Sequence, residues 1–207
     1  MAHAYDVADS ISHTRGYVPE WLMAKLYFRY GVVSSAKTLN LLATLHNYEQ
    51  QGKKAILIKP ALDTRSTKVE SRAGLSHVAD IILKESDSLP ELLLPYIKDG
   101  ISAILVDEVQ FISPEQVEYL REVSALGEVP VLCYGLRTRS DTTLWPSVIT
   151  LMALADSIEE IKTECAFCDH KAVFSKLMNK EGVDNNGIKL SWDEYLPVCA
   201  KHYYSDV

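Results

Sequence analysis

A segment near the N-terminus has almost the spacing of a loop that binds nucleotide phosphates. Residues 31–38 read GVVSSAKT, and the phosphate-loop consensus is G-x-x-x-x-G-K-[ST]. Backbone N–H groups of such a loop surround phosphates, together with the N-terminus of the following helix. Lys37 would reach the outer phosphates and the Thr38 hydroxyl would bind Mg²⁺. Alanine at position 36 replaces the second glycine, so the strict motif is not met: its methyl group would crowd the tight loop, although alanine tolerates helical dihedral angles.

An acidic pair follows an apolar run later in the chain. Residues 103–106 read AILV, which indicates a buried strand, and Asp107 and Glu108 come directly after it. Ligands of open α/β sheets bind at the carboxyl ends of the strands, so Asp107 would hold the water shell of Mg²⁺. Glu108 would take a proton from water or from a substrate hydroxyl. Taken alone, the first segment also fits an ordinary helix start and the second a strand that ends in solvent; their combination favours a nucleoside triphosphate site.

Two short pairs of metal-ligating residues lie near the C-terminus. One pair has the form C-x-x-C and the other C-x-x-H, and two such pairs can close a tetrahedral zinc site. Since four protein ligands leave no position for a catalytic water, the zinc would be structural. His170 is an alternative fourth ligand, which we rank lower because it would leave the second pair with one ligand. The expected ligands are Cys165, Cys168, Cys199 and His202.

Short apolar strands alternate with helical patterns between these segments. This alternation is typical of a parallel sheet covered by helices on both faces. Ser113, Pro114 and Gln116 have the spacing of a helix N-terminus with a capping box. The expected strands cover 25–30, 55–59, 103–106 and 129–133, and the expected helices cover 38–51 and 114–126.

The remaining segments give weaker patterns. Residues 60–80 are polar and irregular, and Pro90 indicates a helix start within the apolar stretch 81–99. Residues 148–156 fit either a strand or a helix. Residues 158–164 fit a strand, and 171–178 and 188–196 fit two strands joined by a loop. We therefore expect three regions: an arm (1–22), a nucleotide-binding α/β domain (23–160) and a small zinc-binding domain (161–207).

Composition limits the classes of partner. The 207 residues carry a net charge of −7, which argues against nucleic acid polymers and anionic membranes as main partners. No apolar run approaches the ~20 residues that span a bilayer, and residues 1–22 lack the apolar segment of a secretory signal. We expect a cytoplasmic protein, in which cysteines serve as metal ligands or buried thiols more often than as disulfides.

Four segments together resemble the type II thymidine kinase family of the bacterial kind. They are KLYFRYGVVSSAKT, ILVDEVQFIS, PVLCYGLRT and ECAFCDHK…VCAKHYY, and the resemblance extends from about residue 24 to 203. It implies a phosphate-loop α/β core and a small zinc-bearing domain whose lasso loop closes over thymidine. It also implies ATP with Mg²⁺ as phosphate donor, thymidine 5′-monophosphate as product, and a homotetramer or a homodimer.

The resemblance also implies roles for individual residues. Glu108 would take the proton of the thymidine 5′-hydroxyl. ATP and its phosphates would contact Gly31, Val32, Val33, Ser34, Ser35, Ala36, Lys37, Thr38, Asp107, Glu108, Val109 and Gln110. Mg²⁺ would be associated with Thr38, Asp63 and Asp107, and the phosphates with Arg65. The nucleoside would contact Phe111, Leu136, Trp145, Ile188 and Tyr195.

Two other functions stay open from the sequence. In a phosphate-loop ATPase, Glu108 would activate water instead of a sugar hydroxyl. In a catalytically impaired nucleotide-binding homologue, Ala36 and an altered lasso would have abolished transfer. The lasso of the family carries I-G-G, where this chain has Lys189-Leu190-Ser191.

Overall fold

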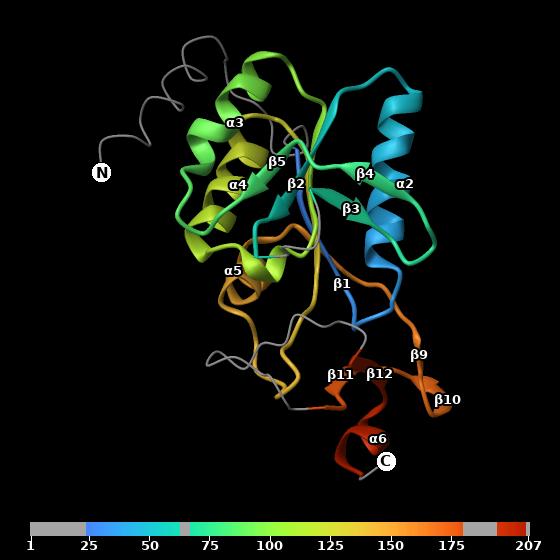
Figure 1. Ribbon diagram of the computed structural model, residues 1–207. Helices are drawn as coiled ribbons and strands as arrows, with labels where there is room; N and C mark the ends of the chain where they lie inside the picture. The colour runs from blue at the N-terminus through green and yellow to red at the C-terminus, as the bar shows by residue number, and fades with distance from the viewer. Residues whose placement is uncertain (1–23, 63–66, 180–193, 206–207) are drawn as a thin grey trace.

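A parallel sheet forms the centre of the structure, a computed structural model that describes residues 24–62, 67–179 and 194–205 (Figure 1). Within these residues the sheet has six strands in the order β5-β2-β6-β7-β1-β8, and each neighbouring pair is parallel. The strands are β1 (Leu26–Tyr30), β2 (Ala55–Pro60), β5 (Ile81–Leu83), β6 (Ala103–Val106), β7 (Val131–Gly135) and β8 (Ser157–Glu160).

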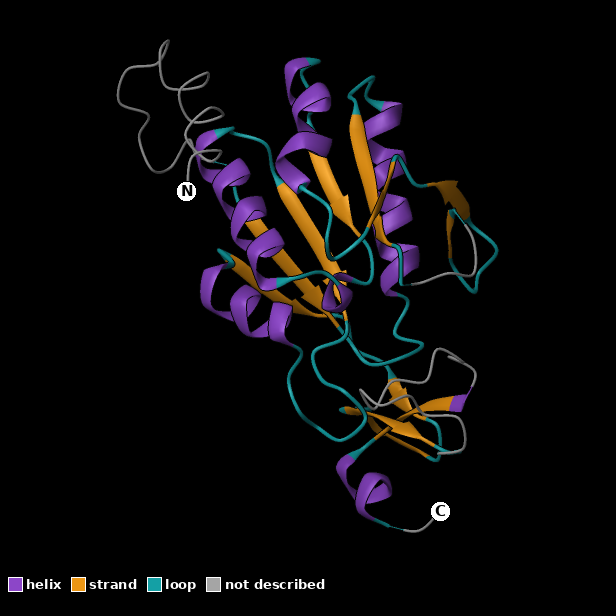
Figure 2. Ribbon diagram, turned by 60° about the vertical axis from the view of Figure 1, so that its left-hand side comes forward, coloured by secondary structure: helices purple, strands orange, loops and turns teal. Residues whose placement is uncertain are grey.

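Helices cover both faces of this sheet, as the alternating pattern predicts (Figure 2). Helix α2 (Lys37–Gln50) packs Leu41, Leu42 and Leu45 against one face. Helices α3 (Leu89–Lys98), α4 (Pro114–Leu126) and α5 (Pro146–Leu154) pack against the other face. Neighbouring strand residues point to opposite faces, so the fully apolar strands supply both cores.

The start of helix α4 shows why its boundary could be predicted. The Ser113 hydroxyl accepts the backbone N–H of Gln116 at 3.2 Å, and the Gln116 side chain accepts the backbone N–H of Ser113 at 3.0 Å. Pro114 occupies the first turn, where its missing N–H costs nothing. These local contacts depend on four neighbouring residues alone, and the prediction of a helix over 114–126 is confirmed.

Several short elements differ from the sequence-based expectation. Residues 60–80 are not irregular throughout, because β3 (Lys68–Glu70) and β4 (Ser76–Val78) form an antiparallel hairpin. Strand β5 precedes α3 within 81–99, and 148–156 lies mostly in helix α5. Three-residue strands are too short to show a period, so their existence depends on tertiary pairing.

The C-terminal elements form a small lobe beyond the carboxyl ends of the sheet strands (Figure 2). In its described residues, two antiparallel pairs are present: β9 (Glu164–Cys165) with β10 (Cys168–Lys171), and β11 (Phe174–Leu177) with β12 (Tyr195–Val198). The 3₁₀ helix η2 (Val109–Phe111) belongs to the core, and helix α6 (Ala200–Tyr204) to the lobe. The expected division at residues 160/161 stays a prediction.

Some predicted features lie outside the described residues. They are the arm 1–22, the metal- and phosphate-associated residues Asp63 and Arg65, and the lasso position Ile188. Among the helices that the structure describes, none combines the length and the apolar character needed to cross a membrane.

Candidate active site

The phosphate loop connects the end of β1 to the start of α2 and lies at the carboxyl edge of the sheet. Gly31 opens it, and its N–H donates to the Gly135 carbonyl at 3.2 Å. A Cβ at position 31 would lie 2.6 Å from the Ile161 carbonyl oxygen and would also meet the Ser35 hydroxyl. Only glycine therefore fits at this close approach of three chain segments.

Ala36, at the position of the second consensus glycine, has a left-handed backbone, with φ 62° and ψ 26°. These angles are of the opposite hand to the helical dihedral angles that alanine tolerates well. The left-handed conformation costs an L-residue with a Cβ about 1–2 kcal/mol, whereas glycine adopts it freely. This chain keeps the loop geometry of the consensus at the expense of local strain.

Replacing Ala36 with glycine is therefore expected to stabilise the protein. The gain is about 0.5–1 kcal/mol, because glycine also raises the entropy of the unfolded chain and so offsets part of the relief. Thermal unfolding should show a midpoint that is higher by roughly 1–4 °C. Ala43→Gly is the matched control: Ala43 is exposed in the right-handed interior of α2 and should lower the midpoint. A lower midpoint for Ala36→Gly would contradict the strain argument.

The first two residues of α2 lie under the loop. Lys37 is buried, with 8% of the residue exposed, and its ammonium donates to the Val32 carbonyl at 2.8 Å. Burial lowers the pKa of Lys37, and the nearby carboxylates Glu108 and Asp107 oppose this shift. The Thr38 hydroxyl donates to a carboxylate oxygen of Asp107 at 3.2 Å, so the two residues expected to hold Mg²⁺ lie side by side.

Asp107 and Glu108 follow β6 and differ in their surroundings. Asp107 is buried, and its burial, reinforced by the charge of Glu108, raises its pKa to about 7. Glu108 is half-buried, lines the cavity described below and has a left-handed backbone with φ 48°. A non-glycine residue in this region is strained, and such strain occurs often at functional sites.

Gln110 holds Glu108 in place. Its amide nitrogen donates to a Glu108 carboxylate oxygen at 2.6 Å, and its amide oxygen accepts the Leu136 N–H at 3.0 Å. Gly135 leaves room for this bridge, because a Cβ there would lie 2.5 Å from the Gln110 amide oxygen. Val109 is fully buried in the core, and neither Val109 nor Gln110 is among the described residues that line the cavity. Their expected contact with ATP stays a prediction; in the structure Gln110 supports the site by holding Glu108.

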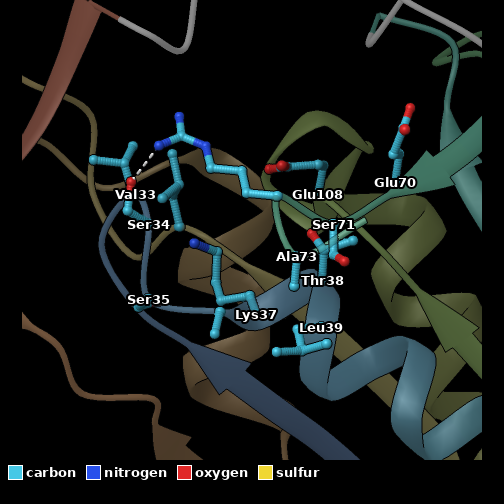
Figure 3. A pocket seen from close by; sticks show the side chains of 13 residues that line it. Val33, Ser34, Ser35, Lys37, Thr38, Leu39, Glu70, Ser71, Ala73 and Glu108 are labelled. Carbon is cyan, nitrogen blue, oxygen red and sulfur yellow. Dashed lines mark hydrogen bonds between the residues drawn. The ribbon is translucent and has the colours of Figure 1, made fainter. Parts of the chain in front are cut away.

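A cavity of about 430 Å³ opens beside the loop (Figure 3). The loop and the first residues of α2 form one side of it, with Glu108 and Leu136. The turn of the β3–β4 hairpin forms another side, with Glu70, Ser71, Arg72 and Ala73. These four hairpin residues were not predicted as part of the site, because nothing in their spacing shows that the hairpin reaches the loop.

The residues expected to contact the nucleoside belong to two groups of apolar side chains. Phe111 packs edge-on against buried Trp145, with ring centroids 5.2 Å apart. Val33, Leu136 and Tyr195 form a separate buried cluster, which joins the phosphate loop to the small lobe.

A hydrogen bond also joins the phosphate loop to the small lobe. The buried Ser175 hydroxyl, on β11, accepts the Val33 N–H at 3.1 Å. This contact could not be predicted from the sequence, because 142 residues separate its partners.

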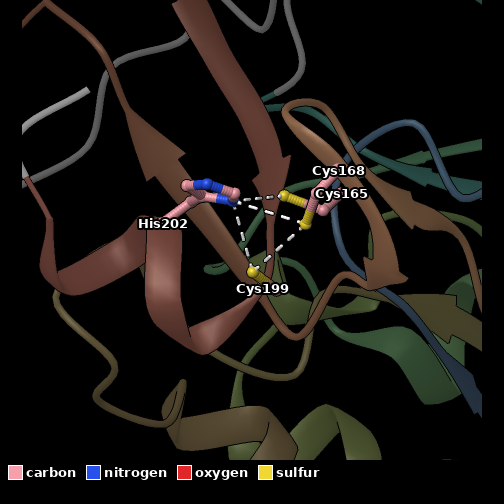
Figure 4. A group of neighbouring side chains, drawn as sticks. All are labelled: Cys165, Cys168, Cys199 and His202. Carbon is pink, nitrogen blue, oxygen red and sulfur yellow. Dashed lines mark hydrogen bonds between the residues drawn. The ribbon is translucent and has the colours of Figure 1, made fainter.

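The four expected zinc ligands lie together in the small lobe (Figure 4). The His202 Nδ1 atom is 3.3, 3.5 and 3.4 Å from the sulfur atoms of Cys165, Cys168 and Cys199, and the last two sulfurs are 3.8 Å apart. A tetrahedron with Zn–S bonds of about 2.3 Å has S–S edges of about 3.8 Å. The cluster therefore fits zinc. His170 contacts Cys168 at 3.4 Å but is not part of the four-ligand group.

The protonation of one thiol of the cluster also suits a metal. Burial would raise the pKa of Cys165, but hydrogen bonds from the backbone of Cys199 and Phe167 and from His202 outweigh burial and lower it to about 6. A thiolate is the form that binds metals. The Cys165 sulfur is thus prepared as a ligand by its own surroundings.

The fold and this site define a phosphate-loop nucleotide-binding protein of the α/β class. More narrowly, the chain belongs to the thymidine kinase family, whose model matches residues 24–203. It is 37% identical to a thymidine kinase of Francisella tularensis over 197 residues, which cover 89% of this chain and 99% of that protein. It is 39% identical to a thymidine kinase of Pasteurella multocida over 187 residues, which cover 87% of this chain and 97% of that protein.

Proposed function

We propose that this chain transfers the terminal phosphate of ATP to the 5′-hydroxyl of thymidine with Glu108 as the general base. Membership of the thymidine kinase family supports the reaction. The observation that carries the residue assignment is the position of Glu108. It lines the same cavity as Lys37 and Thr38, next to Asp107, and Gln110 holds its carboxylate.

This arrangement determines how the proton and the electron pairs move during the transfer. The Glu108 carboxylate accepts the 5′-hydroxyl proton as the hydroxyl oxygen forms a bond to the terminal phosphorus. The bond between that phosphorus and the β,γ-bridging oxygen breaks, and ADP leaves with the electron pair. Lys37 and the loop N–H groups stabilise the charge on the phosphate oxygens. Thr38 and Asp107 would hold Mg²⁺, which neutralises phosphate charge when it is bound. Asp63, which we also assign to Mg²⁺, and Arg65, which we assign to the phosphates, lie outside the described residues.

The nucleoside would lie on the apolar side of the site. We assign its base to Phe111, Leu136, Trp145 and Tyr195, of which Phe111 is half-buried. Ile188 belongs to this assignment through the family resemblance alone, because it lies outside the described residues. Aromatic faces and aliphatic side chains suit a pyrimidine ring.

The proposal extends to the metal, the assembly and the compartment. Zinc in the Cys₃His cluster would be structural, since the four ligands complete a tetrahedron. The family resemblance supports a homotetramer and a cytoplasmic location. Light scattering of the purified protein during gel filtration would measure the assembly, and a monomer would contradict this part of the proposal.

The activity is tested by ADP release with and without thymidine. We expect release to depend on thymidine and to stop when 5′-deoxythymidine, which lacks the acceptor hydroxyl, replaces it. Equal release with both compounds, or without any nucleoside, would indicate the alternative ATPase. No release under any of these conditions would indicate a nucleotide-binding homologue without catalysis.

A further inference from the structure

The side-chain amide of Gln110 is held in one orientation. Its oxygen accepts the backbone N–H of Leu136 at 3.0 Å, and its nitrogen donates to a Glu108 carboxylate oxygen at 2.6 Å. If the amide were turned over, its NH₂ group would face the Leu136 N–H and its oxygen would face a carboxylate, so both hydrogen bonds would be lost. Gln110 is 2% exposed, so water does not supply replacements. The amide is thus fixed as a donor to Glu108.

This fixed donor makes the two oxygens of the Glu108 carboxylate unequal. One oxygen accepts the Gln110 amide, and within the described residues the other has no hydrogen-bond partner. Because Glu108 lines the cavity, the second oxygen is the one available to an acceptor hydroxyl. A general base must lie within hydrogen-bonding distance of the proton that it takes, so the transfer depends on how this carboxylate is turned.

Lys37 is a competing partner for the same carboxylate. Both residues line the cavity (Figure 3). Burial lowers the pKa of Lys37, and the charge of Glu108 is the largest effect that opposes this shift. Opposite charges attract strongly in a partly buried site, so a Glu108 carboxylate without its amide donor would turn towards the Lys37 ammonium. An ion pair between them would occupy both the base and the cation that the donor phosphate needs.

We propose that Gln110 is a positioning residue of the transfer step, which aims one oxygen of Glu108 at the acceptor hydroxyl and keeps the carboxylate away from the Lys37 ammonium. This inference rests on the proposed function, because it takes Glu108 as the base and Lys37 as the phosphate-binding cation. In this role Gln110 acts through Glu108. Its removal should therefore have little effect where Glu108 has already lost its carboxylate.

The first test is a double-mutant cycle of kcat with thymidine and ATP. Methionine at position 110 keeps the length of the side chain and removes both hydrogen bonds. Gln110→Met should lower kcat by about 10- to 100-fold in the wild type, the cost of a misplaced reacting group. In Glu108→Gln, the same replacement should lower the remaining kcat by less than about threefold, because residues that act as a unit are not additive. Equal losses in the two backgrounds would overturn the positioning role.

The second test is calorimetric binding of the β,γ-methylene analogue of ATP, with Mg²⁺ and without nucleoside. Gln110→Met should weaken binding by about three- to fivefold, because Glu108 then competes with the phosphates for Lys37 in a partly exposed ion pair. Glu108→Gln in the same chain should restore the wild-type affinity, which it would not do if the loss came from a damaged fold. A loss that remains in the double variant would overturn the separation of Glu108 from Lys37.

Gln116→Met is the matched control. Gln116 is also a buried glutamine, but its side chain caps helix α4. Its replacement should lower the midpoint of thermal unfolding and leave kcat and analogue binding unchanged. If Gln110→Met does not fold, Gln110→Asn gives the same comparisons, because its amide is one methylene too short to reach both partners.

The two tests separate this inference from the proposed function. The binding test needs no acceptor, so it is independent of whether the wild type phosphorylates thymidine. A wild type that releases no ADP with thymidine would contradict the proposed function, whereas equal kcat losses in an active enzyme would contradict the role of Gln110 alone.

Discussion

Replacing Glu108 with glutamine is expected to lower kcat by about 10²- to 10⁴-fold, the usual effect of removing a general base. Glutamine keeps the size of the side chain but cannot accept the hydroxyl proton. The fold should survive, because the Gln110 amide can still donate to the side-chain oxygen at position 108. ATP should still bind, because Lys37 and the loop are unchanged.

This expectation is checked by steady-state kinetics with thymidine and by calorimetric binding of the ATP analogue. Glu118→Gln is the matched control, since Glu118 is exposed on α4 and lies outside the cavity. Its replacement removes the same charge as the replacement of Glu108. Its kcat should equal that of the wild type. If Glu108→Gln keeps more than about a third of the wild-type turnover, well above the loss typical of a missing base, another group accepts the proton.

Replacing Cys199 with serine is expected to release zinc and to unfold much of the small lobe. Structural zinc supplies roughly 10–16 kcal/mol of apparent binding free energy in zinc-finger peptides, and a small lobe has little core to replace it. Cys199 directly follows β12, which carries Tyr195, and β12 pairs with β11, which carries Ser175. The loss should therefore raise KM for thymidine more than KM for ATP, while the α/β core stays folded.

Metal analysis of carefully purified protein should find one zinc per wild-type chain and none in the variant. Circular dichroism would follow the core helices, and kinetics would give both KM values. His170→Ala is the control, because His170 contacts Cys168 but lies outside the four-ligand group. It should keep its zinc. An absence of zinc from the wild type, or a Cys199→Ser variant that keeps both metal and thymidine affinity, would refute the structural role.

The sequence predicts best those features that depend on neighbouring residues. The capping box of α4 involves residues 113–116, and the strand–loop–helix order around Lys37 follows from one continuous segment. The zinc ligands are also local pairs, so their grouping could be predicted from spacing.

Features that depend on distant partners could not be predicted in this way. Position 36 is left-handed because the loop must close, and alanine itself gives no sign of that hand. Gln110 belongs to a motif that suggests contact with ligand, but its amide is used to join Glu108 to Leu136. Arg72 reaches the loop only because a hairpin, whose strands are too short to show a period, folds over the carboxyl edge of the sheet.

The position of β1 between β7 and β8 has a consequence for synthesis on the ribosome. Arg29 of β1 contacts Tyr134 and Glu159, which lie 105 and 130 residues later in the chain. At elongation rates on the order of 5–20 residues per second, roughly 6–26 seconds pass between the synthesis of β1 and that of its second neighbour. The phosphate loop follows β1, so it has no sheet to hold its shape until β7 and β8 have been synthesised. Nucleotide in the cell therefore cannot assist the early steps of folding. Chains stopped before Glu160 should therefore expose an apolar strand to chaperones and proteases.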